Sequence, residues 1–163
     1  MFTPDRAMSG HGQHRVPELT TSLENLRRQH DAAEEMAAGI VAIVASYRDD
    51  YDAVPIARLI GKLNALLRVH FAYEDSILYP LIIRSGDAEA AALASQFDVE
   101  MGALATEFEE FARRWSGPTV IAGMFELFRE EATVLFAALG ARIERENDLL
   151  YPLAERLTDA RAA

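Results

Sequence analysis

The sequence predicts an all-α protein, built as an antiparallel four-helix bundle with up-down-up-down topology. Apolar residues recur every three or four positions along four long stretches, which is the pattern of a helix with one buried face. Short polar segments separate the stretches, at residues 48–53, 85–87 and 116–119. No stretch shows the alternating pattern of a strand, and long amphipathic helices with short connections are typical of bundles.

The four expected helices fill almost the whole chain. They cover about residues 17–47, 54–84, 88–115 and 120–157. Pro17 suits the first turn of the first helix, where its missing N–H group is not needed, and Asp87 suits the N-cap of the third. The predicted organisation is an N-terminal arm, one bundle domain and a short tail, at residues 1–16, 17–158 and 159–163.

Polar residues interrupt the apolar stripes near the middle of the expected helices. His30 lies on the stripe of the first helix, and His70 and Glu74 lie one turn apart on the stripe of the second. Arg142 and Glu146 have the same spacing on the fourth. Burial of a lone charged group is unfavourable, so these side chains are expected to satisfy one another, or to bind water or a metal ion.

An internal repeat relates the second and fourth expected helices. Residues 67–81 match residues 139–153 at a shift of 72 positions, with a glutamate at the equivalent place in both copies. His70 of the first copy aligns with Arg142 of the second. A histidine and a glutamate one turn apart form a metal-ligand arrangement, so the second copy reads as an altered metal site.

Each copy also contains a tyrosine followed by a proline, Tyr79 with Pro80 and Tyr151 with Pro152. Proline lacks the N–H group of a helical hydrogen bond, so the second helix is expected to bend or end at Pro80. Both tyrosines, like Tyr73, could supply a phenolate near a metal, but Tyr79 and Tyr151 are expected instead to cap one end of the bundle. Regular helical spacing continues the buried stripes through Ile77 and Leu149.

Three motifs together resemble the hemerythrin-like family of HHE cation-binding domains. They are RRQHDAAEE around His30, HFAYEDSILYP from His70, and ERENDLLYP around Glu146. The resemblance spans about residues 19–157. It implies a four-helix bundle with a non-heme di-iron centre, held by several histidines and two carboxylates. Members of the family bind dioxygen, sense oxygen, nitric oxide or iron, or handle peroxide.

Four positions match the metal-ligand pattern of the family. The matching residues are His30, His70, Glu74 and Glu146. Met101 and Arg142 stand where the family pattern has histidines. Glu100, beside Met101, and Glu34, one turn after His30, are weaker candidates for accessory ligands.

Two interpretations of the altered ligand set stay open. Two imidazoles and two carboxylates suffice for one divalent ion but are few for two irons, and Arg142 at about 5 Å would repel a divalent ion by roughly 6–7 kcal/mol at an effective dielectric of 20. We therefore expect at most one ion of iron or another divalent metal. In the other interpretation no metal binds, because Arg142 bridges Glu74 and Glu146 as a buried counter-charge.

Composition narrows the choice of function. A net charge of −10 disfavours nucleic acid and anionic membranes as partners, and the absence of cysteine excludes thiolate ligands and disulfides. No signal peptide or membrane span is apparent, so a cytoplasmic protein is expected.

The favoured function is a hemerythrin-like module that binds or senses O2, NO or iron through a reduced metal site. A non-enzymatic role is favoured over an enzyme. The alternatives are a metal-free structural or interaction bundle, which could form a homo-oligomer, and an iron-dependent scavenger of peroxide or nitric oxide.

Overall fold

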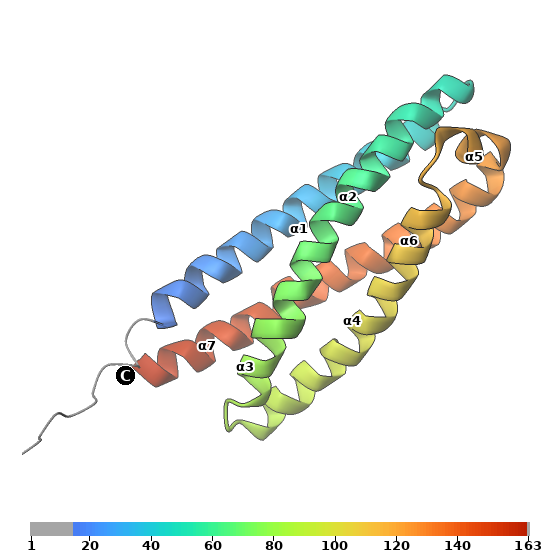
Figure 1. The fold of residues 1–163 in the computed structure, drawn as a ribbon. Coiled ribbons are helices and arrows are strands. Elements are labelled where there is room, and N and C mark those ends of the chain that lie inside the picture. Colours follow the sequence, from blue (N-terminus) through green and yellow to red (C-terminus); the bar gives the residue numbers. More distant parts are fainter. Residues whose placement is uncertain (1–14, 163) are drawn as a thin grey trace, which may run out of the picture.

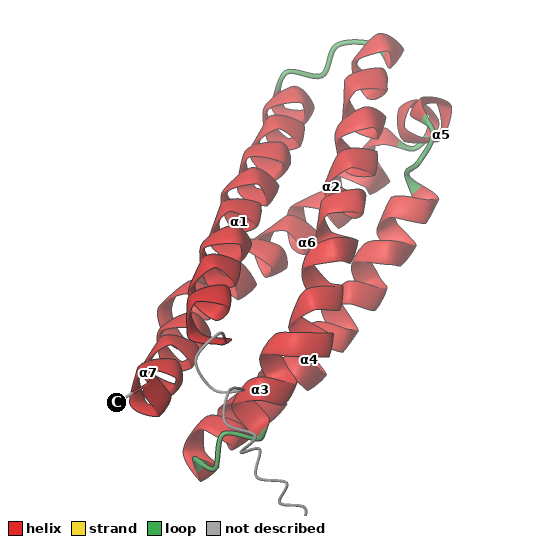
Figure 2. Ribbon diagram, turned by 60° about the vertical axis from the view of Figure 1, so that its left-hand side comes forward, coloured by secondary structure: helices red, strands yellow, loops and turns green. Residues whose placement is uncertain are grey.

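The computed structural model describes residues 15–162, and within this range every regular element is helical. The long helices lie side by side in an elongated bundle (Figure 1), and the loops between them lie at its ends (Figure 2). The predicted all-α class is confirmed. Residues 1–14, which make up most of the expected N-terminal arm, and residue 163 of the expected tail lie outside the described range.

The first half of the described chain forms two long helical rods. Helix α1 spans Arg15–Ala45, and the short 3-10 helix η1, Asp50–Asp52, leads into α2, Ala53–Tyr73. The π-helical turn η2, Glu74–Leu78, follows α2 directly and continues into α3, Tyr79–Ile83. α2, η2 and α3 therefore make one uninterrupted rod, which packs against α1 and α4.

The second half has the same plan with one additional helix. Helix α4 spans Ala88–Arg114, and its N-terminus is capped as predicted, because Asp87 accepts a hydrogen bond from the N–H of Ala90 at 3.0 Å. The stretch expected as one helix from residue 120 is divided into α5, Pro118–Gly123, and α6, Phe125–Arg145. Met124, with φ −135° and ψ 41°, breaks the helix between them. The π turn η3, Glu146–Leu150, and α7, Tyr151–Ala162, complete the fourth rod.

The two π turns occupy equivalent positions in the internal repeat. The N–H of Tyr79 donates to the carbonyl of Glu74, five residues earlier, and the N–H of Tyr151 donates in the same way to Glu146. A π turn holds more residues than an α turn, so the side chains beyond it are rotated around the helix. π turns of this kind occur often at functional sites.

This rotation makes two sequence predictions wrong. Ile77 and Leu149 were expected on the buried stripes, yet they are 47% and 49% exposed, while the next residues, Leu78 and Leu150, are fully buried. The rod also continues past Pro80, which lies in the first turn of α3, where its missing N–H group is tolerated.

The core between the rods is apolar except where five charged or imidazole side chains are buried together, namely His30, His70, Glu74, Arg142 and Glu146. Aromatic rings at the C-terminal end of α4 pack against α6, where Trp115, directly after α4, lies at a centroid distance of 5.3 Å and an interplanar angle of 69° from Phe128. The buried charged and imidazole side chains form a separate polar cluster. None of the described helices is long and apolar enough to cross a membrane.

Candidate metal centre

Four side chains from three rods meet in the polar cluster of the core. His30 comes from α1, His70 from α2, Glu74 from the start of η2 and Glu146 from the start of η3. Each is at most 1% exposed. Each offers one ligand atom, and these four atoms all lie within 4.8 Å of one another. The structure therefore brings together the four residues that match the ligand pattern of the family.

The ring nitrogens of the two histidines point at each other and at the carboxylates. The Nε2 atoms of His30 and His70 lie 3.1 Å apart. Oε2 of Glu146 lies 3.0 Å from Nε2 of His30, and Oε1 of Glu74 lies 3.6 Å from Nε2 of His70. The cluster thus places two nitrogen and two oxygen donors around one small volume.

Two amide side chains hold the outer nitrogens of the histidines. Oε1 of Gln29 lies 2.9 Å from Nδ1 of His70, and Oδ1 of Asn147 lies 3.0 Å from Nδ1 of His30. An amide oxygen only accepts hydrogen bonds, so each Nδ1 must carry the proton. In a neutral imidazole the other nitrogen then has a free lone pair. His70, whose burial favours the neutral form, therefore presents a lone pair on Nε2 to the cluster, and His30 does the same in its neutral form.

Gln29 and Asn147 were not identified from the sequence. They directly precede His30 and directly follow Glu146, so they lie beside the buried stripes rather than on them. Gln29 of α1 contacts His70 of α2, and Asn147 of η3 contacts His30 of α1. Contacts between different helices cannot be read from the spacing of residues within one helix. The only available signal was an amide residue adjacent to a candidate ligand. Such outer hydrogen bonds are typical of metal-bound histidines.

The imidazole of His70 is neutral at physiological pH. Burial lowers its pKa to about 3, with further lowering by His30 and by the positive charge of Arg142. Neutral imidazole is the form that binds metal ions. No proton therefore has to be removed from His70 before it can act as a ligand.

The carboxylate of Glu74 receives hydrogen bonds from both tyrosines of the repeat. Tyr79 donates its hydroxyl to Oε2 at 3.3 Å, and Tyr151 donates to Oε1 at 2.9 Å. The expectation that these tyrosines cap the bundle end is wrong, because the π turns rotate both rings into the core. Burial, and then repulsion from Glu146, raises the pKa of Glu74 well above its ordinary value, although the two phenols and Arg142 oppose this.

Arg142 is buried beside the cluster with its nitrogens paired. Its Nε donates to Oε1 of Glu146, and its Nη2 donates to the Tyr79 hydroxyl at 2.7 Å and to the Phe97 carbonyl at 3.0 Å. Nη1 lies 3.4 Å from Oε2 of Glu100. Arg142 therefore binds Glu146 directly but meets Glu74 only through the Tyr79 hydroxyl, so the expected direct bridge between the two glutamates is not formed.

The other candidate positions lie outside the ligand cluster. Glu100 is partly exposed and accepts a hydrogen bond from Nη1 of Arg145 at 2.6 Å, and this bond is the first of several causes that lower its pKa. Met101 is buried in the apolar core. Glu34 is exposed on α1 and lines a surface groove against α6.

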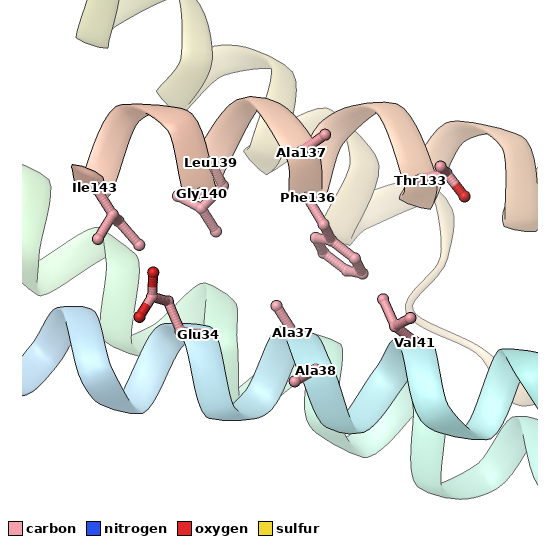
Figure 3. Close-up of a pocket in the computed structure, with 10 residues that line it drawn as sticks. All are labelled: Glu34, Ala37, Ala38, Val41, Thr133, Phe136, Ala137, Leu139, Gly140 and Ile143. Carbon is pink, nitrogen blue, oxygen red and sulfur yellow. The ribbon is translucent and has the colours of Figure 1, made fainter. Parts of the chain in front are cut away.

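This groove is a mostly apolar depression of about 390 Å³ between α1 and α6. Figure 3 shows Glu34, Ala37 and Val41 facing Phe136 and Ile143 across it. None of the four clustered ligand residues lines the groove.

The fold and the cluster define a class of protein: a helical bundle with a buried set of nitrogen and oxygen donors suited to a cation. Comparison with protein families identifies the class more closely. The model of the Hemerythrin HHE cation binding domain matches residues 21–154, and the chain belongs to this family. No curated protein and no solved structure matches the chain.

Proposed function

We propose that the protein binds one divalent metal ion, iron in the first instance, through His30, His70, Glu74 and Glu146. One observation carries the proposal: the Nε2 atoms of His30 and His70 face each other at 3.1 Å with two carboxylates beside them. Lone pairs at this separation repel unless a cation or a proton lies between them. The supporting amides hold a proton on each outer nitrogen, and a cation between the neutral inner nitrogens would satisfy both imidazoles and both carboxylates.

The donor set suits iron among the common metals. Two histidines with carboxylates are typical of non-heme iron sites that keep open coordination positions. Bound iron would supply an open position for a small ligand such as O2 or NO. The role that follows is a hemerythrin-like module that binds or senses such a ligand, or senses iron itself.

The surroundings of Glu146 support one ion rather than two. Its Oε1 accepts from Arg142 while its Oε2 faces His30, so it can serve a metal and the guanidinium at the same time. Arg142 and Met101 fill the positions where the family pattern has two further histidines. The fixed positive charge of Arg142 disfavours a second cation on that side of the cluster.

The family architecture extends the proposal to the topology and to the domain limits. We infer that α1, α2 with α3, α4, and α6 with α7 correspond to the four antiparallel helices of an up-down-up-down bundle. The position of the loops at the ends of the rods supports this assignment (Figure 2). The domain would then comprise residues 17–158.

A metal-free bundle is the second candidate. The observation that favours it is the pairing of Arg142, which meets Glu146, Tyr79, the Phe97 carbonyl and Glu100. A buried ion pair satisfied in this way can be a structural unit without any metal. The protein would then act through its surface, as a structural or interaction module.

Metal analysis of the untagged protein separates the two candidates. Wild-type protein is loaded anaerobically with excess Fe²⁺, desalted and analysed for iron and protein. We expect about one iron per chain, and its loss in His70→Leu. The exposed Asn25→Ala, whose side chain pairs with Arg28 away from the cluster, is the control and should keep its iron. Iron-free wild-type protein would support the metal-free bundle, and two irons per chain would contradict the single site.

A further inference from the structure

The two tyrosines of the repeat donate to the same carboxylate, yet their oxygens have different surroundings. The Tyr79 hydroxyl donates to Oε2 of Glu74 and accepts from Nη2 of Arg142 at 2.7 Å. Its proton and a lone pair are therefore both engaged. The guanidinium beside it also makes the Tyr79 oxygen an unfavourable ligand for a cation.

The Tyr151 oxygen lies inside the ligand cluster. Its hydroxyl donates to Oε1 of Glu74 at 2.9 Å, and the same oxygen lies 3.2 Å from Nε2 of His30. Asn147 faces Nδ1 of His30, so in the neutral imidazole the proton lies on Nδ1 and Nε2 carries a lone pair. The Tyr151 oxygen therefore lies beside one proposed ligand atom from each of two residues, Nε2 of His30 and Oε1 of Glu74.

Packing fixes the orientation of the Tyr151 ring. The side chain is fully buried. Its ring lies nearly parallel to the imidazole of His30, with an interplanar angle of 7° and a centroid distance of 5.3 Å. The guanidinium of Arg27 lies 5.5 Å from the ring centroid. The phenol is thus held toward the cluster before any metal arrives.

We propose that Tyr151 is a fifth ligand of the metal ion and binds through its phenolate oxygen when the ion is ferric. The inference rests on the metal site proposed above and deepens it by adding a residue that the four-ligand set does not include. Coordination breaks the O–H bond of Tyr151, forms an oxygen–iron bond and releases one proton to the solvent. The third anionic ligand balances the charge that iron gains when a one-electron oxidant removes an electron from the ferrous ion.

The repeat provides a matched pair of variants for the test. Tyr151→Phe and Tyr79→Phe make the same chemical change at equivalent positions, and each removes one hydrogen bond to Glu74. Wild type and both variants are loaded with one equivalent of Fe²⁺ without oxygen, desalted, and oxidised with ferricyanide. After a second desalting step, iron content and visible absorption are measured on the same samples.

We expect a phenolate-to-iron charge-transfer band in the visible spectrum of ferric wild type and of Tyr79→Phe. Tyr151→Phe should retain iron but lose the band completely. A band that survives in Tyr151→Phe, or ferric wild type with bound iron and no band, would overturn the assignment. Loss of the band in Tyr79→Phe alone would assign the ligand to the other tyrosine and overturn it too.

Two further results keep this test separate from that of the metal site. Absence of bound iron in every protein overturns the metal site and the ligand together, whereas bound iron without a band overturns the ligand alone. If Tyr151→Phe fails to fold, resonance Raman spectra of ferric wild type and Tyr79→Phe decide the question. Excitation in the visible band must enhance tyrosinate ring vibrations in both proteins, and their absence contradicts the proposal.

Discussion

His30 and His70 face each other through Nε2 atoms 3.1 Å apart, although each Nδ1 atom is bound to an amide oxygen. When both imidazoles are neutral, neither Nε2 atom can donate to the other, and this arrangement supports the cation site proposed above. The relationship depends on Gln29 and Asn147, which are not ligands themselves.

Gln29→Ala and Asn147→Ala should each weaken metal binding by about 10- to 100-fold. Without the amide oxygen, the histidine can place its proton on Nε2, where it blocks the metal. Competition for Fe²⁺ against a coloured chelator measures the affinity. Asn25→Ala is the matched control, because this exposed amide on α1 pairs with Arg28 and has no part in the cluster. Unchanged affinity in both variants would show that the amides do not fix the protons.

Arg142→Ala should destabilise the metal-free protein by about 3–5 kcal/mol at neutral pH, because it leaves buried carboxylates without their counter-charge. Urea unfolding in the presence of a chelator measures the loss. Arg145→Ala is the control, since Arg145 also pairs with Glu100 but its side chain is 41% exposed. Its removal should cost less than about 1 kcal/mol.

The cost of Arg142→Ala should also fall at acidic pH. Arg142 opposes the rise in the pKa of Glu74, so its removal raises that pKa further. An acid whose folded pKa exceeds its unfolded value destabilises the fold while it is ionised. That penalty is complete above the folded pKa and fades as the pH falls toward the ordinary value of 4.5. A cost that grows between pH 7 and pH 5 would contradict this explanation.

The double variant Met101→His with Arg142→His should bind more iron per chain than wild type, and bind it more tightly. It restores both histidines of the family pattern and removes a charge that repels cations. Iron analysis after identical loading measures the change, with each single variant as a reference. Equal iron content in the double variant and wild type would show that these two positions do not limit the site.

The π turn η2 predicts opposite responses at two adjacent residues. Leu78→Ala should cost about 2–5 kcal/mol of stability, because Leu78 is fully buried. Ile77→Ala should change stability by only about 0.5 kcal/mol, because Ile77 is 47% exposed. Thermal or urea unfolding of the two variants measures the difference. A regular α-helix through this segment would give the reverse order.

The sequence was sufficient to predict the helical class and the four candidate ligands. His30, His70, Glu74 and Glu146 lie on apolar stripes with regular spacing, and a stripe that must face the core carries its polar residues with it. That argument holds as far as each glutamate, because α2 and α6 are regular up to that point.

Beyond each glutamate the same argument fails, as Ile77 and Leu149 show. The π turn adds one residue to a helical turn but leaves the apolar residues at regular spacing in the sequence. The sequence therefore shows a continuous apolar stripe, while in the structure the side chains after the turn are rotated around the helix axis. For the same reason the bundle end was the favoured position for Tyr79 and Tyr151, and a phenolate near a metal was only the alternative. The break at Met124 was also missed, because Ile121, Phe125 and Phe128 keep helical spacing across it.

The two halves of the chain keep the same backbone around their glutamates while their chemistry differs. Each has a π turn whose backbone hydrogen bond joins a tyrosine to a glutamate, and neither bond involves the side chain of His70 or Arg142. Histidine and arginine have codons that differ by a single base. At the metal site proposed above, a single-base change between histidine and arginine would therefore remove or restore a ligand while the backbone bond of the π turn stays in place.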